Sequence, residues 1–238
     1  MIQKIASFFF YNSSRDYLRD FVIRAAKSLP EDAMVLDAGA GDCIYKEHFK
    51  AVHYESADFL QVDKPYAEVT HVCDLANIPV EDDRYDLVLF TQVMEHLPDP
   101  LKVLKELRRV LKPKGKLWLS APFNYEEHEQ PYDFYRYTQF GFAHLLKKGG
   151  FAVEELDWLE GYYGTVAYQM KSIAINLPVS PANYSGIFFK IFGPLMALIM
   201  KSISMILAYF YAKADRGFKY KKSGYCKNYC LIATPIEK

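Results

Sequence analysis

The chain has 238 residues, of which 51% are apolar and 24% are charged, so it has enough apolar side chains for a large core and is not an intrinsically disordered protein. Lysine plus arginine and aspartate plus glutamate number 29 each, which gives a formal net charge of zero. Proteins that bind nucleic acids usually carry a basic excess or a basic stripe. The first 180 residues show neither, so no nucleic acid is expected as a partner.

The N-terminal residues 1–30 are expected to form a helical segment. Their leading part, MIQKIASFFFYNSSRDY, is expected to be amphipathic and has no small-residue cleavage site, so a secretory signal is not expected. The four cysteines, Cys43, Cys73, Cys226 and Cys230, form no zinc-like spacing with one another or with histidines. We therefore expect reduced thiols, no metal ion and a cytoplasmic location.

Short apolar runs alternate with segments of helical periodicity. Strands are expected at 33–37, 53–58, 68–72, 85–90, 116–121 and 151–156, with a last strand at 229–234. One helix should begin at Pro100, capped by Asp99, and end in the stretch 112–115. A second helix should run over 138–148, from the N-cap Thr138 to a glycine pair. This alternation predicts an α/β fold with a mostly parallel sheet covered on both faces.

The first of these strands runs into a glycine turn, VLDAGAGDC (35–43). Glycine is needed where the backbone turns tightly and approaches a ligand with no Cβ atom in between. Asp37 ends this strand, Asp58 ends the next, and Asp74 follows the third. Ligands of such sheets bind beyond the carboxyl ends of the strands, and an acid about 20 residues after the turn can accept both hydroxyls of a ribose.

Two classes of cofactor fit this pattern, a nicotinamide dinucleotide and an adenosyl sulfonium. The dinucleotide fingerprint needs a third glycine where this chain has Ile44. Asp37 and Asp42 flank the turn and would repel a pyrophosphate, but they would attract a sulfonium with its α-ammonium group. The charge of the turn favours the sulfonium, and a nicotinamide-dependent oxidoreductase stays as an alternative.

The segments VLDAGAGDC, YESADF and CDLANIPVEDDRYDLVLFTQVMEHLPDP resemble, in order and separation, class I S-adenosylmethionine (SAM)-dependent methyltransferases of the small-molecule type. The resemblance covers residues 32–156. It implies a Rossmann-like, doubly wound, seven-stranded sheet with an antiparallel last strand, here with an apolar helical insertion before that strand. We expect a single domain over 1–238, with a helical segment at 1–30, a SAM-binding core at 31–157, a helical insertion or lid at 158–225 and the final strand at 226–238.

The resemblance also implies which residues hold SAM. They are Asp37, Gly39 and Gly41 at the methionine end, Asp58 at the ribose hydroxyls, Phe59, Asp74 and Leu75 around the adenine, and Gln92 to His96 near the sulfur. The sequence departs from the family pattern at Cys43, where a glycine is commonest. Cysteine is small, so the pocket should survive this change.

The fifth strand is followed by an aromatic segment, APFNYEEHEQPYDFYRYT (121–138), where a loop should cross the mouth of the site. Similar segments in methyltransferases linked to bacterial surface polysaccharides imply a glycan-like acceptor. His128 and His96 are candidate general bases, since an imidazole pKa of about 6.5 suits that role. Arg136, with Asp133 beside it, is a candidate to bind an acidic acceptor. Alternatively, Asp133 and Arg136 pair with each other and the loop is structural.

Residues 187–212 form an apolar stretch long enough to span a bilayer if helical. A span is not expected, because Gly193 and Pro194 should interrupt the helix, Lys201 would lie near the membrane centre, and the strand at 229–234 must return to the sheet. The stretch is expected either to form a lid or a homodimer contact, or to lie peripherally in a membrane interface with the basic residues that follow it.

The sequence therefore predicts a methyltransferase that acts on a small-molecule or glycan-like acceptor, at oxygen in the simplest case. Its catalytic candidates are His128, His96, Asp133 and Arg136. A SAM-binding protein without turnover, serving as a regulatory or assembly subunit, is an alternative of a different class.

Overall fold

The structure is a computed structural model that describes residues 11–60 and 66–236. It divides into two compact units, one comprising Tyr17–Leu159 with Asn228–Lys238 and the other Met1–Asp16 with Glu160–Lys227. The second unit covers nearly the same residues as the expected helical insertion. The predicted helix near the N-terminus is confirmed as α2 (Ser13–Lys27), whereas residues 1–10 of the predicted amphipathic segment lie outside the described residues.

The unit Tyr17–Leu159 with Asn228–Lys238 is built on a seven-stranded sheet in the order β3-β2-β1-β4-β5-β7-β6. The strands are β1 (Met34–Ala38), β2 (His53–Asp58), β3 (His71–Val72), β4 (Tyr85–Thr91), β5 (Leu111–Pro122), β6 (Phe151–Trp158) and β7 (Asn228–Pro235). Strands β1 to β5 pair in parallel, and β7 is antiparallel to both β5 and β6. The predicted fold class is confirmed. The strand order reverses between β1 and β4, which is where sheets of this kind bind ligands.

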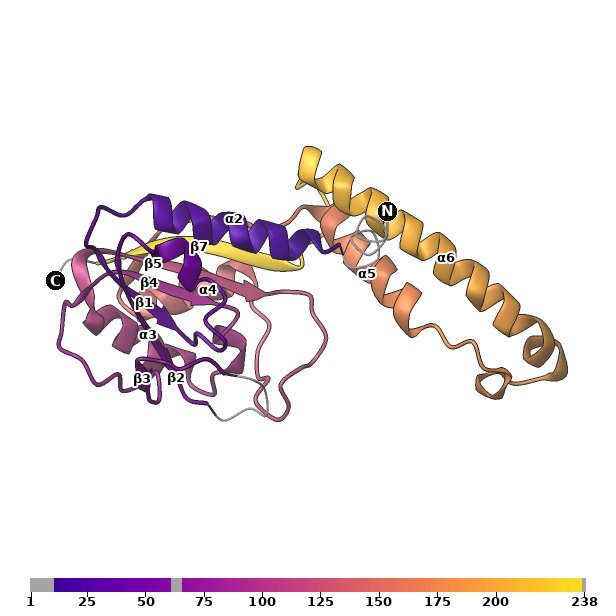
Figure 1. Cartoon of the computed structure of the whole chain (residues 1–238), viewed down its shortest axis with the longest axis horizontal. Helices are drawn as coiled ribbons and strands as arrows, with labels where there is room; N and C mark the ends of the chain where they lie inside the picture. Colours follow the sequence, from indigo (N-terminus) through magenta and orange to yellow (C-terminus); the bar gives the residue numbers. More distant parts are fainter. Residues whose placement is uncertain (1–10, 61–65, 237–238) are drawn as a thin grey trace. The chain divides into compact units, whose positions relative to one another are not determined.

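Helices cover both faces of this sheet, with α2 on one face and α3 (Pro100–Val110) on the other (Figure 1). Apolar residues of β1, β4 and β5 form one buried cluster with α2, in which the rings of Phe21 and Trp118 lie 4.9 Å apart. The next helix, α4 (Gln139–Lys148), packs beside β6. The predicted caps are confirmed, because Asp99 accepts from the Lys102 backbone N–H and Thr138 accepts from that of Gly141.

The helix was predicted to end within 112–115 and the next strand to begin at 116, but α3 ends at Val110 and passes directly into β5. Leu111 already has extended backbone and pairs with Tyr85 of β4. The register shifts between Tyr85 and Leu87 of β4, because the extra residues of β5 around Pro113 form an irregularity of the ladder. The ammonium of Lys112 binds both carboxylate oxygens of Asp86 at 2.8 and 2.7 Å.

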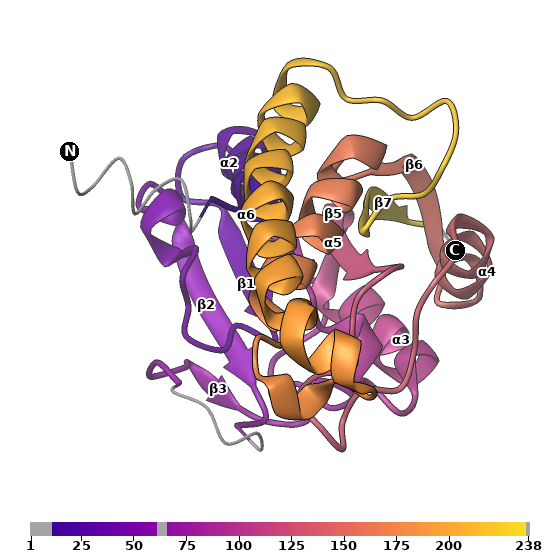
Figure 2. The same cartoon turned by 90° about the vertical axis from the view of Figure 1, so that its right-hand side faces the viewer.

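The unit Met1–Asp16 with Glu160–Lys227 contains α5 (Tyr162–Asn176), the short helix η3 (Pro181–Asn183) and α6 (Ile187–Gly217). Helices α5 and α6 lie side by side (Figure 2). The expected interruption at Gly193 and Pro194 is wrong, because α6 is one helix of 31 residues. A proline removes only one hydrogen bond from a helix of this length. Gly193 has a packing role, since a Cβ there would lie 2.8 Å from the ring of Tyr184.

Candidate cofactor and acceptor site

A pocket of about 240 Å³ lies beyond the carboxyl ends of β1, β2 and β4. It is lined by Gly39, Asp58, Phe59, Tyr66, Asp74, Leu75, Gln92, Val93, His96, Leu97, Pro98, Glu129 and Tyr132. Six of these residues were predicted to hold the cofactor, and they come from four separate turns of the chain. The topology of the sheet therefore brings residues that are far apart in the sequence to one pocket.

The glycine turn after β1 needs the left-handed backbone that glycine tolerates. Gly39 has φ +76°, and a Cβ at this position would lie 2.4 Å from a methyl group of Val93. Gly41 has φ +54° and open space around the position of a Cβ. Cys43 also has a positive φ, +53°, which explains why glycine is the commonest residue there in the family pattern. Gln92, another pocket residue, has φ +57°.

Asp37 does not line the pocket. It lies behind the glycine turn, where its side chain is buried and its Oδ2 accepts a hydrogen bond of 2.6 Å from the hydroxyl of Tyr54. Burial raises the pKa of Asp37 to about 7, and the charges of Asp58 and Asp42 act in the same direction, whereas the hydrogen bond from Tyr54 opposes them. A cationic ligand at the turn would favour the charged form of this carboxyl group.

The two other acids line the pocket. Asp58 Oδ2 accepts from the backbone N–H of Gly41 and Oδ1 from that of Leu60, both at 2.9 Å. Asp74 Oδ1 accepts from the backbone N–H of Ala76 at 2.9 Å, which fixes the turn after β3. Phe59 exposes 51% of its surface and can receive a flat ring.

The opposite edge of the pocket is formed by His96, Glu129 and Tyr132. His96 belongs to η2 (Met94–His96), and its Nδ1 lies 2.6 Å from the backbone oxygen of Tyr132. Burial lowers the pKa of His96, so the ring is neutral around pH 7. His96 is therefore the one predicted catalytic residue that reaches the pocket.

His128, Asp133 and Arg136 do not line this pocket. Arg136 binds the Asp133 carboxylate with two N–O distances of 2.6 and 2.7 Å, and it also donates to the backbone oxygens of Tyr125 and Glu126. Hydrogen bonds from Arg136 hold the pKa of Asp133 at about 2. The predicted pairing of Asp133 with Arg136 is thus present in the structure. The pair fastens the loop between β5 and α4.

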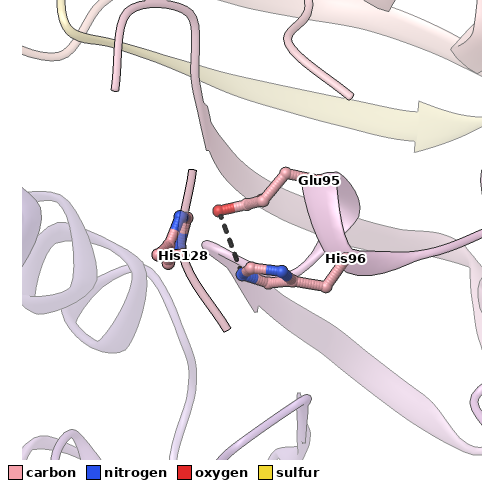
Figure 3. Close-up of side chains that lie close together, drawn as sticks. All are labelled: Glu95, His96 and His128. Carbon is pink, nitrogen blue, oxygen red and sulfur yellow. Dashed lines mark ion pairs between the residues drawn. The ribbon is translucent and has the colours of Figure 1, made fainter. Parts of the chain in front are cut away.

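That loop brings His128 beside His96, with ring centroids 4.6 Å apart, and both face the carboxylate of Glu95 (Figure 3). Glu95 is completely buried, and burial raises its pKa to about 8. The ligand atoms of the three side chains lie within 4.8 Å of one another. Sequence spacing could not reveal this cluster, because the path of the loop alone brings residue 128 back to residue 96.

Sequence reasoning missed Tyr66, Leu97, Pro98 and Glu129 as pocket residues, whereas Val93 belongs to the predicted stretch from Gln92 to His96. Leu97 and Pro98 directly follow that stretch, so proximity in sequence was an available signal. Tyr66 and Glu129 lie in loops whose course the sequence does not determine.

A family model described as a methyltransferase domain matches residues 11–156. The chain belongs to this family. By family and fold it is related to the class I SAM-dependent methyltransferases, whose methyl donor is SAM. The match contains every strand of the sheet up to β6 and all the predicted SAM-binding residues.

Curated relatives resemble this methyltransferase over part of their length. A probable SAM-dependent methyltransferase of Mycobacterium tuberculosis is 33% identical over 97 residues, which are 37% of this chain and 35% of that protein. A ubiquinone biosynthesis O-methyltransferase of Acinetobacter baylyi is 31% identical over 104 residues, 37% of this chain and 42% of that protein. The chain thus matches less than half the length of these relatives.

A solved structure extends the likeness of fold to nearly the whole chain. The 1,6-didemethyltoxoflavin-N1-methyltransferase of Burkholderia thailandensis, with 1,6-didemethyltoxoflavin and S-adenosylhomocysteine bound, is 17% identical, with a TM-score of 0.53 over 99% of this chain and 86% of that one. At this identity the likeness concerns the fold alone.

The residues present fit SAM. Glycine at position 39 provides the left-handed backbone of the turn and lets Val93 pack against it, and the buried Asp37 behind the turn suits a cation. Asp58 and Asp74 offer carboxylates, and Phe59 an open ring face, in the same pocket. These residues would hold the methionine end, the ribose and the adenine respectively.

Proposed function

We propose that this chain transfers the methyl group of SAM to an oxygen atom of a small, amphiphilic or glycan-like acceptor. The observation that carries the proposal is the composition of one pocket. One side of the pocket contains Asp58 and Asp74, two of the residues predicted to hold SAM. The opposite side is formed by His96, Glu129 and Tyr132. A single pocket can therefore hold a donor and an acceptor next to each other.

Catalysis in such a pocket depends mainly on alignment. SAM would supply an activated methyl group, S-adenosylhomocysteine would leave as the new O–CH₃ bond forms, and the proton of the acceptor hydroxyl would pass to a base or to water. The strained backbone at Gln92 and the bonded loop at His96 hold the two sides of the pocket at a fixed separation. Alignment of this kind can lower a barrier by about 7–11 kcal/mol.

The acceptor class follows from the polar and aromatic groups on that side. Tyr132 exposes 38% of its surface at the pocket, which suits stacking on a sugar or another ring. The ubiquinone and menaquinone methyltransferases among the relatives act, by name, on amphiphilic molecules, and this supports an acceptor of that type. The roles of His128, His96, Asp133 and Arg136 in catalysis stay predictions.

We further propose that α6 attaches the chain to the cytoplasmic surface of a membrane. By length and composition α6 is apolar enough to cross a bilayer, yet only 22% of its most apolar window is buried. The Lys201 ammonium binds the backbone oxygens of Ile175 and Leu177 at the end of α5, both at 2.8 Å. A charge at the middle of the helix is thereby satisfied within the unit.

The contact of Lys201 with the end of α5 also shows where α6 extends past its neighbour. Residues 187–200 lie beyond that point, a length of about 20 Å of helix. Exposed apolar side chains in this part are Ile187, Phe188, Phe189, Ile191, Phe192, Leu195, Met196, Leu198, Ile199 and Met200. Basic residues follow at the other end of α6, as in a segment that inserts its apolar end among lipids and leaves cations at the head groups.

The methyltransferase proposal is tested by product formation. The purified chain is incubated with SAM and, separately, with a lipid extract or a water-soluble glycan fraction, and S-adenosylhomocysteine is measured by mass spectrometry. We expect it to accumulate with the lipid extract, together with a product that gains one CH₂ unit, and not with the Asp58→Ala variant. Binding of SAM without S-adenosylhomocysteine in any fraction would favour the alternative of a SAM-binding protein without turnover.

A further inference from the structure

The carboxylate of Glu95 is an unusual group for the interior of a protein. Its residue has no exposed surface, and neither Oε1 nor Oε2 has a hydrogen-bond partner in the part of the chain that the structure describes. Buried carboxylates are normally paired or bound to a cation, because losing water without replacement strongly disfavours them. The backbone of Glu95 is fixed, since its oxygen accepts from the N–H groups of Phe134 and Tyr135 at 2.9 and 3.2 Å.

Two imidazoles face this carboxylate (Figure 3). His96 Nε2 lies 3.8 Å from Glu95 Oε1, and one ligand atom from each of Glu95, His96 and His128 lies within 4.8 Å of the other two. Two ligands on one ion at about 2.1 Å can be at most about 4.2 Å apart. Small side-chain rotations would therefore close the group around a metal.

The outer nitrogens of both rings are held as in metal-binding histidines. His96 Nδ1 lies 2.6 Å from the backbone oxygen of Tyr132, which can only accept, so Nδ1 carries the hydrogen and Nε2 the lone pair. His128 Nδ1 lies 3.2 Å from the backbone oxygen of Glu126 and 3.3 Å from Asp133 Oδ2. A carbonyl or carboxylate behind the ring fixes the tautomer that a metal requires.

We propose that Glu95, His96 and His128 bind one divalent transition-metal ion, with Zn²⁺ as the best fit. Two imidazoles and one carboxylate suit Zn²⁺, whereas Mg²⁺ prefers oxygen ligands alone. Three protein ligands leave a coordination position for a further oxygen. Glu129 Oε2, 3.9 Å from His96 Nε2, lies near that position.

The location of this metal site gives it a role that rests on the proposed function. His96 and Glu129 line the SAM pocket, so the open coordination position would be available to the acceptor oxygen. A bound ion lowers the pKa of a coordinated hydroxyl and fixes its position. In the metal-loaded protein His96 is then a ligand and the ion assists loss of the acceptor's proton.

Metal binding is tested without SAM or an acceptor, so that its failure is distinguishable from failure of the proposed function. The tag-free full chain is treated with a chelator, dialysed and titrated with Zn²⁺, with Mg²⁺ and with Co²⁺, using calorimetry and the visible absorption of Co²⁺. We expect one Zn²⁺ ion per chain, no displacement by Mg²⁺, and a Co²⁺ spectrum without thiolate charge-transfer bands.

The variants identify the ligands. Glu95→Gln and His128→Ala should each weaken Zn²⁺ binding at least about 100-fold, and Asp133→Asn about 10- to 100-fold. His144→Ala, an exposed histidine of α4 in the same unit, is the matched control and should bind as the unchanged chain does. Retention of secondary structure and of SAM binding shows that each variant is folded.

Three results would overturn the proposal. They are no stoichiometric Zn²⁺ binding, Zn²⁺ binding by the Glu95→Gln and His128→Ala variants that is as tight as that of the unchanged chain, or thiolate bands that assign the ion to cysteines. If Glu95→Gln does not fold, His128→Ala decides alone, because the His128 side chain lies on a loop and is 27% exposed.

Discussion

The carboxylate of Asp58 accepts a hydrogen bond from the backbone N–H of Gly41, with 2.9 Å between Oδ2 and N. The acid at the end of β2 thus holds the glycine turn that follows β1. One carboxylate links the two parts of the predicted SAM site before any ligand is bound. Its other oxygen binds the Leu60 N–H, so both oxygens are already oriented by backbone donors.

Replacing Asp58 should weaken SAM binding strongly. A hydrogen bond to a charged group contributes about 1.5–3 kcal/mol, so Asp58→Ala should raise the dissociation constant for SAM by about 10- to 150-fold. Asp58→Asn retains one acceptor oxygen for Gly41 and should have a smaller effect. Isothermal titration calorimetry measures both. Asp82→Ala, which removes a surface partner of Arg109, is the control and should bind SAM normally.

The buried Asp37 should make stability depend on pH. Its folded pKa of about 7 is raised above the ordinary value of 3.8, so the folded state holds a proton that the unfolded state has lost between these values. The free energy of unfolding should therefore fall as pH rises from about 4 to about 7, by at most about 4 kcal/mol. Above about pH 7, Asp37 should add no further pH dependence.

The variant Asp37→Asn isolates this effect. It keeps an oxygen for the hydroxyl of Tyr54 and removes the charge. In urea titrations at several pH values, its stability relative to the unchanged chain should rise from pH 4 to pH 7. A constant difference across this range would mean that Asp37 is charged in the folded apo protein.

The two glycines of the turn should respond differently to alanine. Gly39→Ala adds a Cβ 2.4 Å from Val93 as well as backbone strain, whereas Gly41→Ala adds the strain alone. Left-handed backbone costs a residue other than glycine about 1–2 kcal/mol. Thermal melting and SAM titration should therefore show a much larger loss for Gly39→Ala, and Val93→Ala in the same chain should recover part of it. Equal losses at both glycines would contradict the role given to Val93.

Charges on the exposed part of α6 should release the chain from membranes. Phe188→Asp with Phe192→Asp should abolish flotation with vesicles of phosphatidylcholine and phosphatidylglycerol. Phe140→Asp changes a still more exposed phenylalanine, 77% accessible, in the other unit and is the matched control. If the unchanged chain sediments without the vesicles and forms a dimer that these α6 substitutions dissociate, the homodimer alternative is correct.

The sequence predicted those features that depend on neighbouring residues. Asp99 and Thr138 were found as helix caps because capping is a contact within one turn. The seven-stranded sheet with its antiparallel last strand, and the pocket of Gly39, Asp58 and Asp74, followed from alternation of strand and helix together with a family resemblance.

Features that depend on tertiary contacts were missed. Leu111 has helical spacing yet pairs with Tyr85, because sheet pairing overrides periodicity at the end of a helix. Pro194 does not end α6, since the helix continues for several turns on its C-terminal side and only one hydrogen bond is lost. The cluster of Glu95, His96 and His128 depends on a loop fastened by Asp133 and Arg136, which no local pattern specifies.

The most direct test of the account is a crystal structure of this chain with S-adenosylhomocysteine bound. The account predicts the ribose hydroxyls within hydrogen-bond distance of Asp58, the adenine against Phe59 with its amino group at Asp74, and the sulfur facing the side of the pocket formed by His96 and Tyr132. A ligand bound elsewhere, or one that leaves Asp58 and Asp74 in contact only with their own backbone, would contradict it.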